Sequence, residues 1–434
     1  MIRPSRRVLF DLRGTTVASA VFLAVACNTY DDSLLRYSDA ATADTNLDVA
    51  SEAPSDASTD SLADTAPEDV TESGQPDTGI DAGDSAPEAD APQDEPFPCT
   101  AVNLDCDNDA TNGCETSIET NGAHCGGCGR DCLGGTCTAG VCQPFALATG
   151  QTSPAGLVVD PGPAGRVYWT NRSADGTIAS VDKAGGPVVV LASGQDLPGG
   201  IAMNATHLFW SNAATGPNGT IVSVPKSNAA DAGAPLLLAS DQTVPLAVAV
   251  HGGRVYWTNA VNNVGSVSAV DVNGGVVDVV ASDQDFPTGI AADDAGVFWV
   301  THDGGRLMTL DLLTVPPQIR ELATDLVQPA GLVLDTTNIY WSELSGNIRR
   351  RSKLSGATTQ LLADQQGLPL SVAVDGIHVY WTDNLNGTIG RTPKGGGAVE
   401  TIASAQNGPM YVVVDNLSVY WTNGGDGTIM RRAK

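Results

Sequence analysis

The chain has 434 residues and a formal net charge of −28 at pH 7, although only 17% of its residues are charged. The acid is concentrated, since residues 1–27 carry +3, residues 28–98 carry −18 and residues 99–434 carry −13. No segment supplies clustered lysine and arginine, which argues against nucleic acid as a partner. The 48 glycines disfavour a long helical protein, so the length indicates several domains or one large all-β unit.

Residues 1–27 are predicted to be an export signal. Three arginines lie within residues 1–7, and the apolar run VASAVFLAVA at 17–26 is too short to span a bilayer as a stable helix. Residues 23–27, LAVAC, resemble a bacterial lipobox, which implies lipidation of Cys27 and a membrane anchor at the outer membrane or surface of a Gram-negative cell. An ordinary signal that removes Cys27 is the alternative. Sec or Tat export and inner or outer membrane stay open.

Residues 28–98 are predicted to be a disordered acidic linker. The stretch is built from Asp, Ala, Ser, Thr, Pro and Glu and holds 19 acids against one arginine. Such a segment cannot bury enough apolar surface to offset the entropy lost on ordering. Its like charges extend it, so we expect a spacer between the membrane and the domains that follow.

Residues 99–142 are predicted to be a small disulfide module. Eight cysteines in an exported, glycine-rich segment predict four disulfides of unknown pairing, because so short a segment cannot build an adequate core. They are Cys99, Cys106, Cys114, Cys125, Cys128, Cys132, Cys137 and Cys142. A zinc site at Cys125, Cys128 and Cys132 is the alternative that an oxidising compartment disfavours. The runs DCDNDATNGCE and HCGGCGRDC resemble cysteine-rich repeats of surface lipoproteins in myxobacteria and their relatives, which implies a surface location.

Oxygen-bearing side chains alternate in the first half of this module. Alternating oxygen ligands are typical of calcium loops, although the glycine and terminal glutamate of an EF-hand are missing at their offsets. The candidate ligands are Asp105, Asp107, Asp109, Asn112 and Glu115. Turns closed by Asp and Asn side chains explain the same residues, so Ca²⁺ is an alternative interpretation and no other cofactor is expected.

Residues 145–434 contain seven repeats. All seven tryptophans stand in a motif of the form Val-Tyr-Trp-Thr-Asn, at Trp169, Trp210, Trp257, Trp299, Trp341, Trp381 and Trp421. A second marker, Ala-Ser-x-Gln-x-x-Pro, precedes each of them, with its proline at Pro154, Pro198, Pro245, Pro287, Pro329, Pro369 and Pro409. In the second repeat four short strands are predicted at 200–203, 207–210, 220–224 and 236–239. Four strands per repeat of about 40 residues predict the blades of a β-propeller.

The repeat resembles the YWTD family of propellers from receptors of the low-density-lipoprotein type, and YWTD itself stands at residues 380–383. That family closes six blades, whereas this chain has seven repeats. The last repeat lacks its fourth strand, and an orphan copy of that strand stands at 145–149, before the first repeat. We therefore predict an all-β, seven-bladed propeller in which the N-terminal strand closes the last blade.

Loops on one face of the ring are the predicted ligand-binding region. The tryptophans themselves are expected to pack adjacent sheets. Four of the motifs end in asparagine, at Asn171, Asn212, Asn259 and Asn423. Repeats four to six instead offer an acidic sector, which consists of His302, Asp303, Glu343 and Asp383. This sector is predicted to hold a cation or a polar ligand such as a glycan, and a solvated rim is the alternative.

The sequence shows no known catalytic motif. We expect a monomeric, lipid-anchored surface protein whose propeller binds an extracellular protein or glycan, or serves as a scaffold. The alternative is a calcium-dependent hydrolase or lyase of the propeller type that uses Asp303, Glu343 and Asp383. A purely structural envelope component is a third interpretation, and fold alone does not decide among them.

Overall fold

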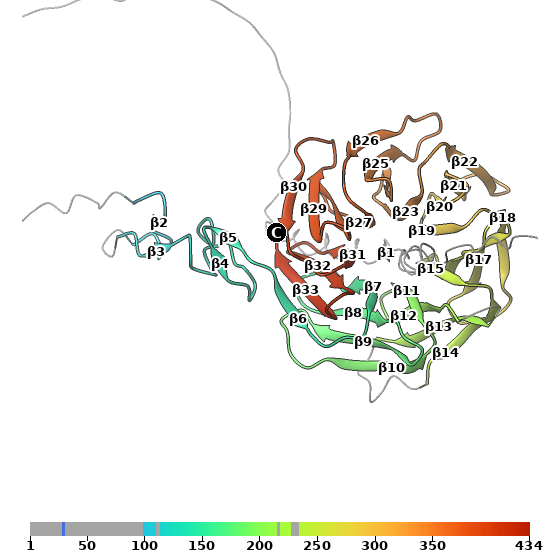
Figure 1. Ribbon diagram of the computed structural model, residues 1–434, viewed down its shortest axis with the longest axis horizontal. Coiled ribbons are helices and arrows are strands. Elements are labelled where there is room, and N and C mark those ends of the chain that lie inside the picture. Colours follow the sequence, from blue (N-terminus) through green and yellow to red (C-terminus); the bar gives the residue numbers. More distant parts are fainter. Residues whose placement is uncertain (1–27, 31–98, 110–112, 215–217, 227–233) are drawn as a thin grey trace, which may run out of the picture.

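Seven four-stranded antiparallel sheets are arranged as blades around a central axis in the computed structural model (Figure 1). The structure describes residues 28–30, 99–109, 113–214, 218–226 and 234–434, and these residues form strands and turns without a helix. None of them therefore forms a helix long and apolar enough to cross a membrane. The prediction of an all-β, seven-bladed propeller is confirmed.

Blades 1 to 6 run from an innermost to an outermost strand in chain order, and blade 7 takes its outermost strand from before blade 1. Blade 1 is β7 (Pro154–Val159), β8 (Arg166–Asn171), β9 (Gly176–Asp182) and β10 (Val189–Gln195). Blade 2 is β11 (Pro198–Met203), β12 (His207–Asn212), β13 (Gly219–Pro225) and β14 (Leu236–Gln242). Blade 3 is β15 (Pro245–His251), β16 (Arg254–Asn259), β17 (Gly265–Asp271) and β18 (Asp278–Gln284).

The remaining blades repeat this order. Blade 4 is β19 (Pro287–Asp293), β20 (Gly296–Thr301), β21 (Arg306–Asp311) and β22 (Gln318–Ala323). Blade 5 is β23 (Pro329–Leu334), β24 (Asn338–Glu343), β25 (Asn347–Ser352) and β26 (Gln360–Ala363). Blade 6 is β27 (Pro369–Val374), β28 (His378–Asp383), β29 (Thr388–Pro393) and β30 (Glu400–Ala403). Blade 7 is β31 (Pro409–Val414), β32 (Ser418–Asn423), β33 (Thr428–Ala433) and β6 (Phe145–Ala148).

The tryptophan of each motif and the tyrosine or phenylalanine before it lie on opposite faces of the second strand of the blade, because side chains alternate along a strand. All seven tryptophans are fully buried, so each blade offers large apolar surface to its neighbours. The hydroxyl residue after the tryptophan then bonds to the innermost strand of the next blade. Thr170 Oγ1 donates to Gly199 O at 2.9 Å, and Ser211 Oγ donates to Leu246 O at 2.7 Å. The repeated tryptophan and the hydroxyl residue after it thus pack and hydrogen-bond neighbouring blades together.

Lysines form a second set of links between blades. Lys394 of blade 6 pairs with Asp335 of blade 5 at 2.5 Å and lies over the ring of Tyr340. Burial alone would raise the pKa of Asp335, but Lys394 and hydrogen bonds from Tyr340 and the following turn lower it to about 2. Equivalent pairs join Lys183 to Asp415, Lys226 to Asp160, Lys353 to Asp293 and Lys434 to Asp375.

At the two remaining junctions between blades, neither the aspartate nor the lysine is present. Asn204 takes the acid's place in blade 2 and is followed by Val272 in blade 3, whereas His251 in blade 3 is followed by Leu312 in blade 4. At the other junctions the aspartate also closes a turn; Asp335 Oδ1, for example, accepts a hydrogen bond from Thr337 N at 2.8 Å. The structure adds an ion pair that crosses to the next blade, which the matched losses of acid and lysine could have revealed.

The first and last segments of the propeller close the ring, as predicted. Strand β6 pairs antiparallel with β33, with Ile429 opposite Ala148. Blade 1 then packs beside blade 7, where Thr422 Oγ1 donates to Ala155 O at 3.1 Å and Lys183 Nζ lies 2.7 Å from Asp415 Oδ2. This closure joins residues more than 260 positions apart in the chain.

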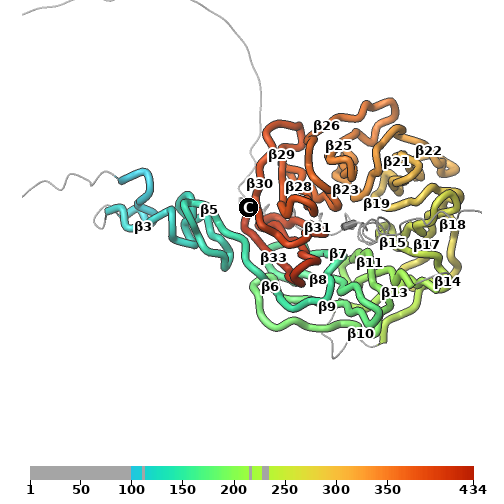
Figure 2. Tube along the Cα trace, in the orientation of Figure 1, coloured from blue at the N-terminus to red at the C-terminus, as the bar shows by residue number. Residues whose placement is uncertain are grey.

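The cysteine-rich module extends from the rim of the ring (Figure 2). It contains the paired strands β2 (Asn103–Leu104) and β3 (Thr116–Ser117) and the hairpin of β4 (Cys137–Thr138) and β5 (Val141–Cys142). Four disulfides hold it together, as predicted, and the structure supplies their pairing: Cys99–Cys114, Cys106–Cys128, Cys125–Cys137 and Cys132–Cys142. All of the sulfurs proposed for zinc are therefore in disulfides and are not available as thiolate ligands.

One short strand departs from the predicted linker. Residues Asn28–Tyr30 form β1, which runs parallel to β11 and contacts the innermost strand of every blade, so it lies in the central channel (Figure 1). An extended backbone supplies the N–H and C=O groups that the free edge of β11 can pair with. The rest of the linker, the export signal and Cys27 lie outside the described residues.

Candidate functional site

A hydrogen-bonded network occupies the face that carries the predicted ligand-binding residues. In blade 1 Trp169 Nε1 donates to Gln151 Oε1 and to Asn171 Oδ1, both at 3.1 Å. The other end of the same glutamine, Nε2, donates to the backbone oxygen of Thr149. The bond from indole to glutamine recurs at Trp210–Gln195, Trp257–Gln242, Trp299–Gln284, Trp381–Gln366 and Trp421–Gln406. The glutamine marker in the sequence is therefore the partner of the buried indole.

The four predicted asparagines belong to this network. Asn171, Asn212, Asn259 and Asn423 are 2–8% exposed. The amide of Asn171 donates to Gln151 Oε1 at 3.0 Å and to Thr177 Oγ1 at 2.9 Å, and the same pattern recurs at the other three. Each amide thus bonds to a residue of its own blade and to a glutamine at or just after the end of the preceding blade, so the structure places the four asparagines in the scaffold and not on an open ligand surface.

Blade 5 builds the network with a different pair of residues. Leu326 stands where the other blades have glutamine, and the fully buried Glu343 replaces asparagine. The longer side chain of Glu343 reaches Trp341 Nε1 at 3.3 Å and accepts a hydrogen bond from Asn347, while Arg349 lies 2.8 Å away and balances its charge. One carboxylate thus replaces two amides.

Asp383 in blade 6 is 1% exposed and ties two loops together. It accepts hydrogen bonds from the backbone N–H of Gly367 at 2.7 Å and Leu368 at 3.0 Å, and from the backbone and side chain of Asn386. Of the three carboxylates in the predicted acidic sector, only Asp303 is exposed. Asp383 and Glu343 are buried in separate blades. The structure therefore does not bring the three carboxylates of the acidic sector together around one ligand.

Blade 4 departs from the network. Thr301 replaces the asparagine, and Arg306 stands opposite it in the strand register, where blades 1, 2, 3 and 7 have a threonine or serine. A cavity of about 190 Å³ lies here, lined by Asp283, Gln284, Asp285, Thr301, Gly304, Arg306 and Met308. Because threonine is shorter than asparagine, the space that the amide fills in other blades is open.

His302 and Asp303 lie in the chain between Thr301 and Gly304, two residues that line this cavity. His302 is buried, and its Nδ1 lies 2.5 Å from Asp303 Oδ1, while Asn262 of blade 3 donates to Asp303 Oδ2 at 2.5 Å. Burial lowers the pKa of His302, against the opposing effect of Asp303 and Asp285, so the ring is neutral at pH 7. The carboxylates, the guanidinium and the hydroxyl around the cavity can bind a ligand rich in hydroxyl groups.

A second candidate centre lies in the cysteine-rich module. Ligand oxygens of Asp105, Asp107 and Glu115 all lie within 4.8 Å of one another, the arrangement that a bound cation requires. The same carboxylates also cap the loop, since Asp105 Oδ1 accepts from Asn108 N at 2.7 Å and Glu115 Oε1 accepts from Cys106 N at 3.2 Å. Hydrogen bonds from its own backbone N–H and from that of Cys106 lower the pKa of Glu115.

Two further calcium candidates are not part of this cluster. Asp109 donates its backbone N–H to Asp107 Oδ1 at 2.9 Å, and Asn112 lies outside the described residues. The three clustered carboxylates would supply hard oxygen ligands, which suit Ca²⁺. The loop contains the side-chain-closed turns predicted from the sequence, and its three clustered carboxylates keep Ca²⁺ as the alternative interpretation.

No protein-family model and no curated protein sequence matches the chain. Among solved structures, virginiamycin B lyase from Staphylococcus aureus is similar, with 16% identity and a TM-score of 0.55 over 67% of this chain and 98% of that one. A streptogramin B lyase has 14% identity and a TM-score of 0.56 over 67% and 96%. A nidogen/laminin complex has 16% identity and a TM-score of 0.42 over 53% and 89%. At these identities the likeness supports the propeller fold alone.

Proposed function

We propose that the protein is exported, anchored to the outer membrane or cell surface through a lipid on Cys27, and displays a ligand-binding propeller. The four disulfides of the module support export, because such bonds persist in oxidising compartments. Because β1 (Asn28–Tyr30) lies in the central channel, a lipid on Cys27 would hold the propeller close to the membrane, and the acidic segment at 31–98 would connect the channel to the cysteine-rich module.

The cavity in blade 4 is the observation that carries the binding role. The other blades fill the equivalent space with an asparagine or a buried carboxylate, so blade 4 alone lacks a side chain that completes the network there. Asp283, Asp285 and Arg306 line this space with groups that donate and accept hydrogen bonds. We propose a glycan of the cell envelope or surroundings as the ligand, bound through its hydroxyl groups.

The experiment compares glycan-array binding of the exported protein with that of two matched variants. Asp283→Asn changes the cavity, whereas Asp241→Asn changes the equivalent loop between blades 2 and 3. Both aspartates have positive φ, at 56° and 57°, and both accept a hydrogen bond from the preceding serine. We expect Asp283→Asn to lose binding about tenfold and Asp241→Asn to retain it. Array binding that both variants lose equally, or an array without signal, would reject the glycan and direct the search to a protein ligand.

The alternative function, a calcium-dependent hydrolase or lyase, requires carboxylates that converge on a substrate. Glu343 and Asp383 instead bond inside blades 5 and 6. We therefore place the binding role first. Metal analysis of the purified protein separates the two, since a tightly retained Ca²⁺ lost in Glu343→Gln and Asp383→Asn variants would favour the enzyme.

The lipid anchor has its own test. Radiolabelled palmitate supplied to expressing cells should label the wild-type protein, and Cys27→Ala should abolish the label, because the thiol of Cys27 is the attachment point of the resembled lipobox. Label that survives this substitution would reject the anchor while leaving the binding role unaffected.

A further inference from the structure

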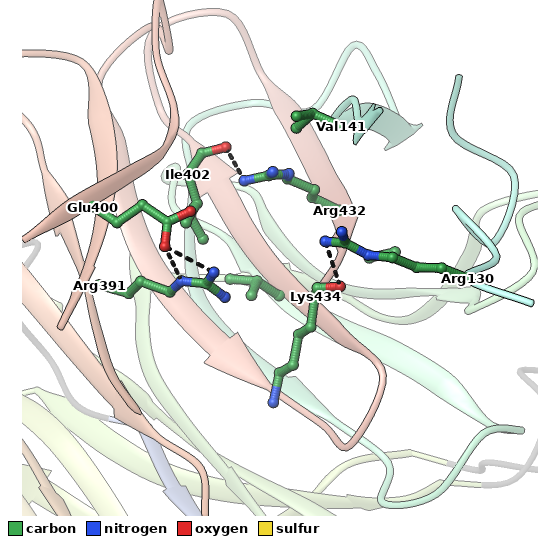
Figure 3. A pocket seen from close by; sticks show the side chains of 9 residues that line it. Arg130, Val141, Arg391, Glu400, Ile402, Arg432 and Lys434 are labelled. Atoms are coloured by element: carbon green, nitrogen blue, oxygen red, sulfur yellow. Dashed lines mark hydrogen bonds and ion pairs between the residues drawn. The ribbon is translucent and has the colours of Figure 1, made fainter. Parts of the chain in front are cut away.

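A cavity of about 280 Å³ lies where the cysteine-rich module meets blades 6 and 7. Its walls carry the positively charged side chains of Arg130 from the module, Arg391 from β29, Arg432 from β33 and Lys434, with Glu400 from β30 as the carboxylate (Figure 3). Three arginines in so small a space are unusual in a chain whose net charge is −28. The Lys434 side chain is directed away from them and forms one of the lysine links between blades, whereas the three arginines are part of neither those links nor the indole network.

The charges in this cavity are only partly neutralised. Arg391 pairs with Glu400 at 2.8 Å, and Lys434 Nζ pairs with Asp375 at 2.6 Å. Among the described residues, the structure gives Arg130 and Arg432 no side-chain carboxylate partner. Arg130 donates to a main-chain oxygen of Lys434, the last residue of the printed sequence, at 3.5 Å.

Arg432 is held in place by backbone oxygens. It is 9% exposed, its Nε donates to Cys142 O at 2.8 Å, and one terminal nitrogen donates to Ile402 O. These bonds come from the module and from blade 6, so they fix the guanidinium at the junction. Burial, with Arg391 and Arg130 nearby, lowers the pKa of Arg432 despite the presence of Glu400. A buried cation beside like charges destabilises the site unless an anion compensates.

We propose that this cavity binds an oxyanion, that is, a carboxylate, phosphate or sulfate group. A planar guanidinium presents a fork of N–H donors that matches two oxygens of such a group, and Arg432 is already oriented by its backbone bonds. The volume falls just below the range of drug-sized ligand pockets, which suits a single small anionic group. An occupant would bridge the module and the propeller.

Two sources can supply this oxyanion. One is a free or ligand-borne anion from the surroundings, and the other is the acidic segment of this chain at 28–98, which holds 19 acids and joins the module directly at Cys99. Both share the same chemistry of recognition, and the experiment below distinguishes them.

The test measures binding of inorganic phosphate to the exported protein by ³¹P NMR, with sodium chloride added to hold ionic strength constant. We expect Arg130→Gln to weaken binding about fivefold, because it removes an exposed cation without touching the blades. Glu400→Gln should strengthen binding by a similar factor, because it removes the carboxylate from the cavity wall. Glu400 is 55% exposed, so this variant should fold.

Asp278→Asn is the matched control for Glu400→Gln. Asp278 also pairs with an arginine, Arg254, across exposed strands of blade 3, but lies away from this cavity. We expect it to leave phosphate binding unchanged. No binding by the wild-type protein, or equal binding by all four proteins, would overturn the proposal.

A further variant identifies the source of the anion. Amides replace the acids nearest the module, at Asp84, Glu88, Asp90, Asp94 and Glu95. If this segment occupies the cavity, phosphate should bind about three- to tenfold more tightly to the variant than to the wild type, since the competitor is gone. Unchanged affinity with the same effects of Arg130→Gln and Glu400→Gln would assign the cavity to an external anion.

Discussion

Removal of Lys183 should open the ring at its closure between blades 1 and 7. Lys183 and Asp415 are only 2% and 3% exposed, and their charged atoms lie 2.7 Å apart. Lys183 Nζ also donates to the backbone oxygens of Asp160 and Gly162. Lys183→Met therefore leaves a buried carboxylate without its counter-ion and two carbonyls without their donor.

The expected loss is about 3–5 kcal/mol in the free energy of unfolding, which is the usual cost of removing one partner from a buried pair. For a domain of this size the loss corresponds to a fall of roughly 6–15 °C in Tm. Lys226→Met is the control, because the pair of Lys226 with Asp160 is more exposed and joins blade 2 to blade 1, not blade 1 to blade 7. We expect this control to lose about 1 kcal/mol.

Thermal and urea denaturation followed by circular dichroism supply the measurement, with the double variant Lys183→Met/Asp415→Asn as the decisive sample. The neutral amide removes the stranded charge, so the double variant should recover about 1–2 kcal/mol relative to Lys183→Met. If Lys183→Met loses no more than Lys226→Met, or if Asp415→Asn adds a further loss, closure does not depend on this pair.

Three other predictions follow from the same structure. The pKa of Asp335 lies near 2, below its usual 3.8, so its contribution to stability is complete above pH 4 and should be lost as the pH falls from about 4 to about 2; Asp335→Asn should flatten that part of a plot of urea midpoint against pH. Glu343→Asn should cost about 1–3 kcal/mol, because Arg349 loses its counter-ion and the new amide lacks the glutamine acceptor that the asparagines of other blades have; adding Leu326→Gln should recover part of the loss by supplying that acceptor, as urea denaturation would show. Calorimetric titration should detect Ca²⁺ binding to the exported protein and at least a tenfold weaker affinity in Asp107→Asn, with Asp131→Asn, which alters another side-chain-closed turn of the module, as the control; no heat from the wild type would reject a cation site at Asp107.

The sevenfold repeat made the fold predictable from the sequence. Seven copies of one tryptophan motif and one proline marker set the number of blades, and the alternation within each copy set the strands. The orphan strand at 145–149 predicted closure because every other blade has its own copy. The four strands predicted in blade 2 all exist, each longer by two or three residues, because ladder hydrogen bonds continue into the turns.

The candidate site was harder to predict from the sequence, because the residue type alone does not show whether a side chain is buried or exposed. Asparagines that follow strands look like exposed turn residues, yet here the second strand ends inside the network, under the glutamine loop. The exchange of glutamine and asparagine in blade 5 for Leu326 and Glu343 is present in the sequence, but its meaning depends on the position of the indole. The acidic sector therefore consisted of similar residues in dissimilar environments.

The sequence by itself determined the eight-cysteine module and a seven-bladed ring, because each depends on local pattern or on repetition along the chain, and it predicts an export signal at 1–27. Only the tertiary structure decided the disulfide pairing, the lysine links between blades, the cavity left by Thr301 and the cationic cavity beside Arg432. Each of these brings together side chains from different strands, different blades or different domains. Their partners, burial and charge balance are set by packing in three dimensions, which no spacing along the chain encodes.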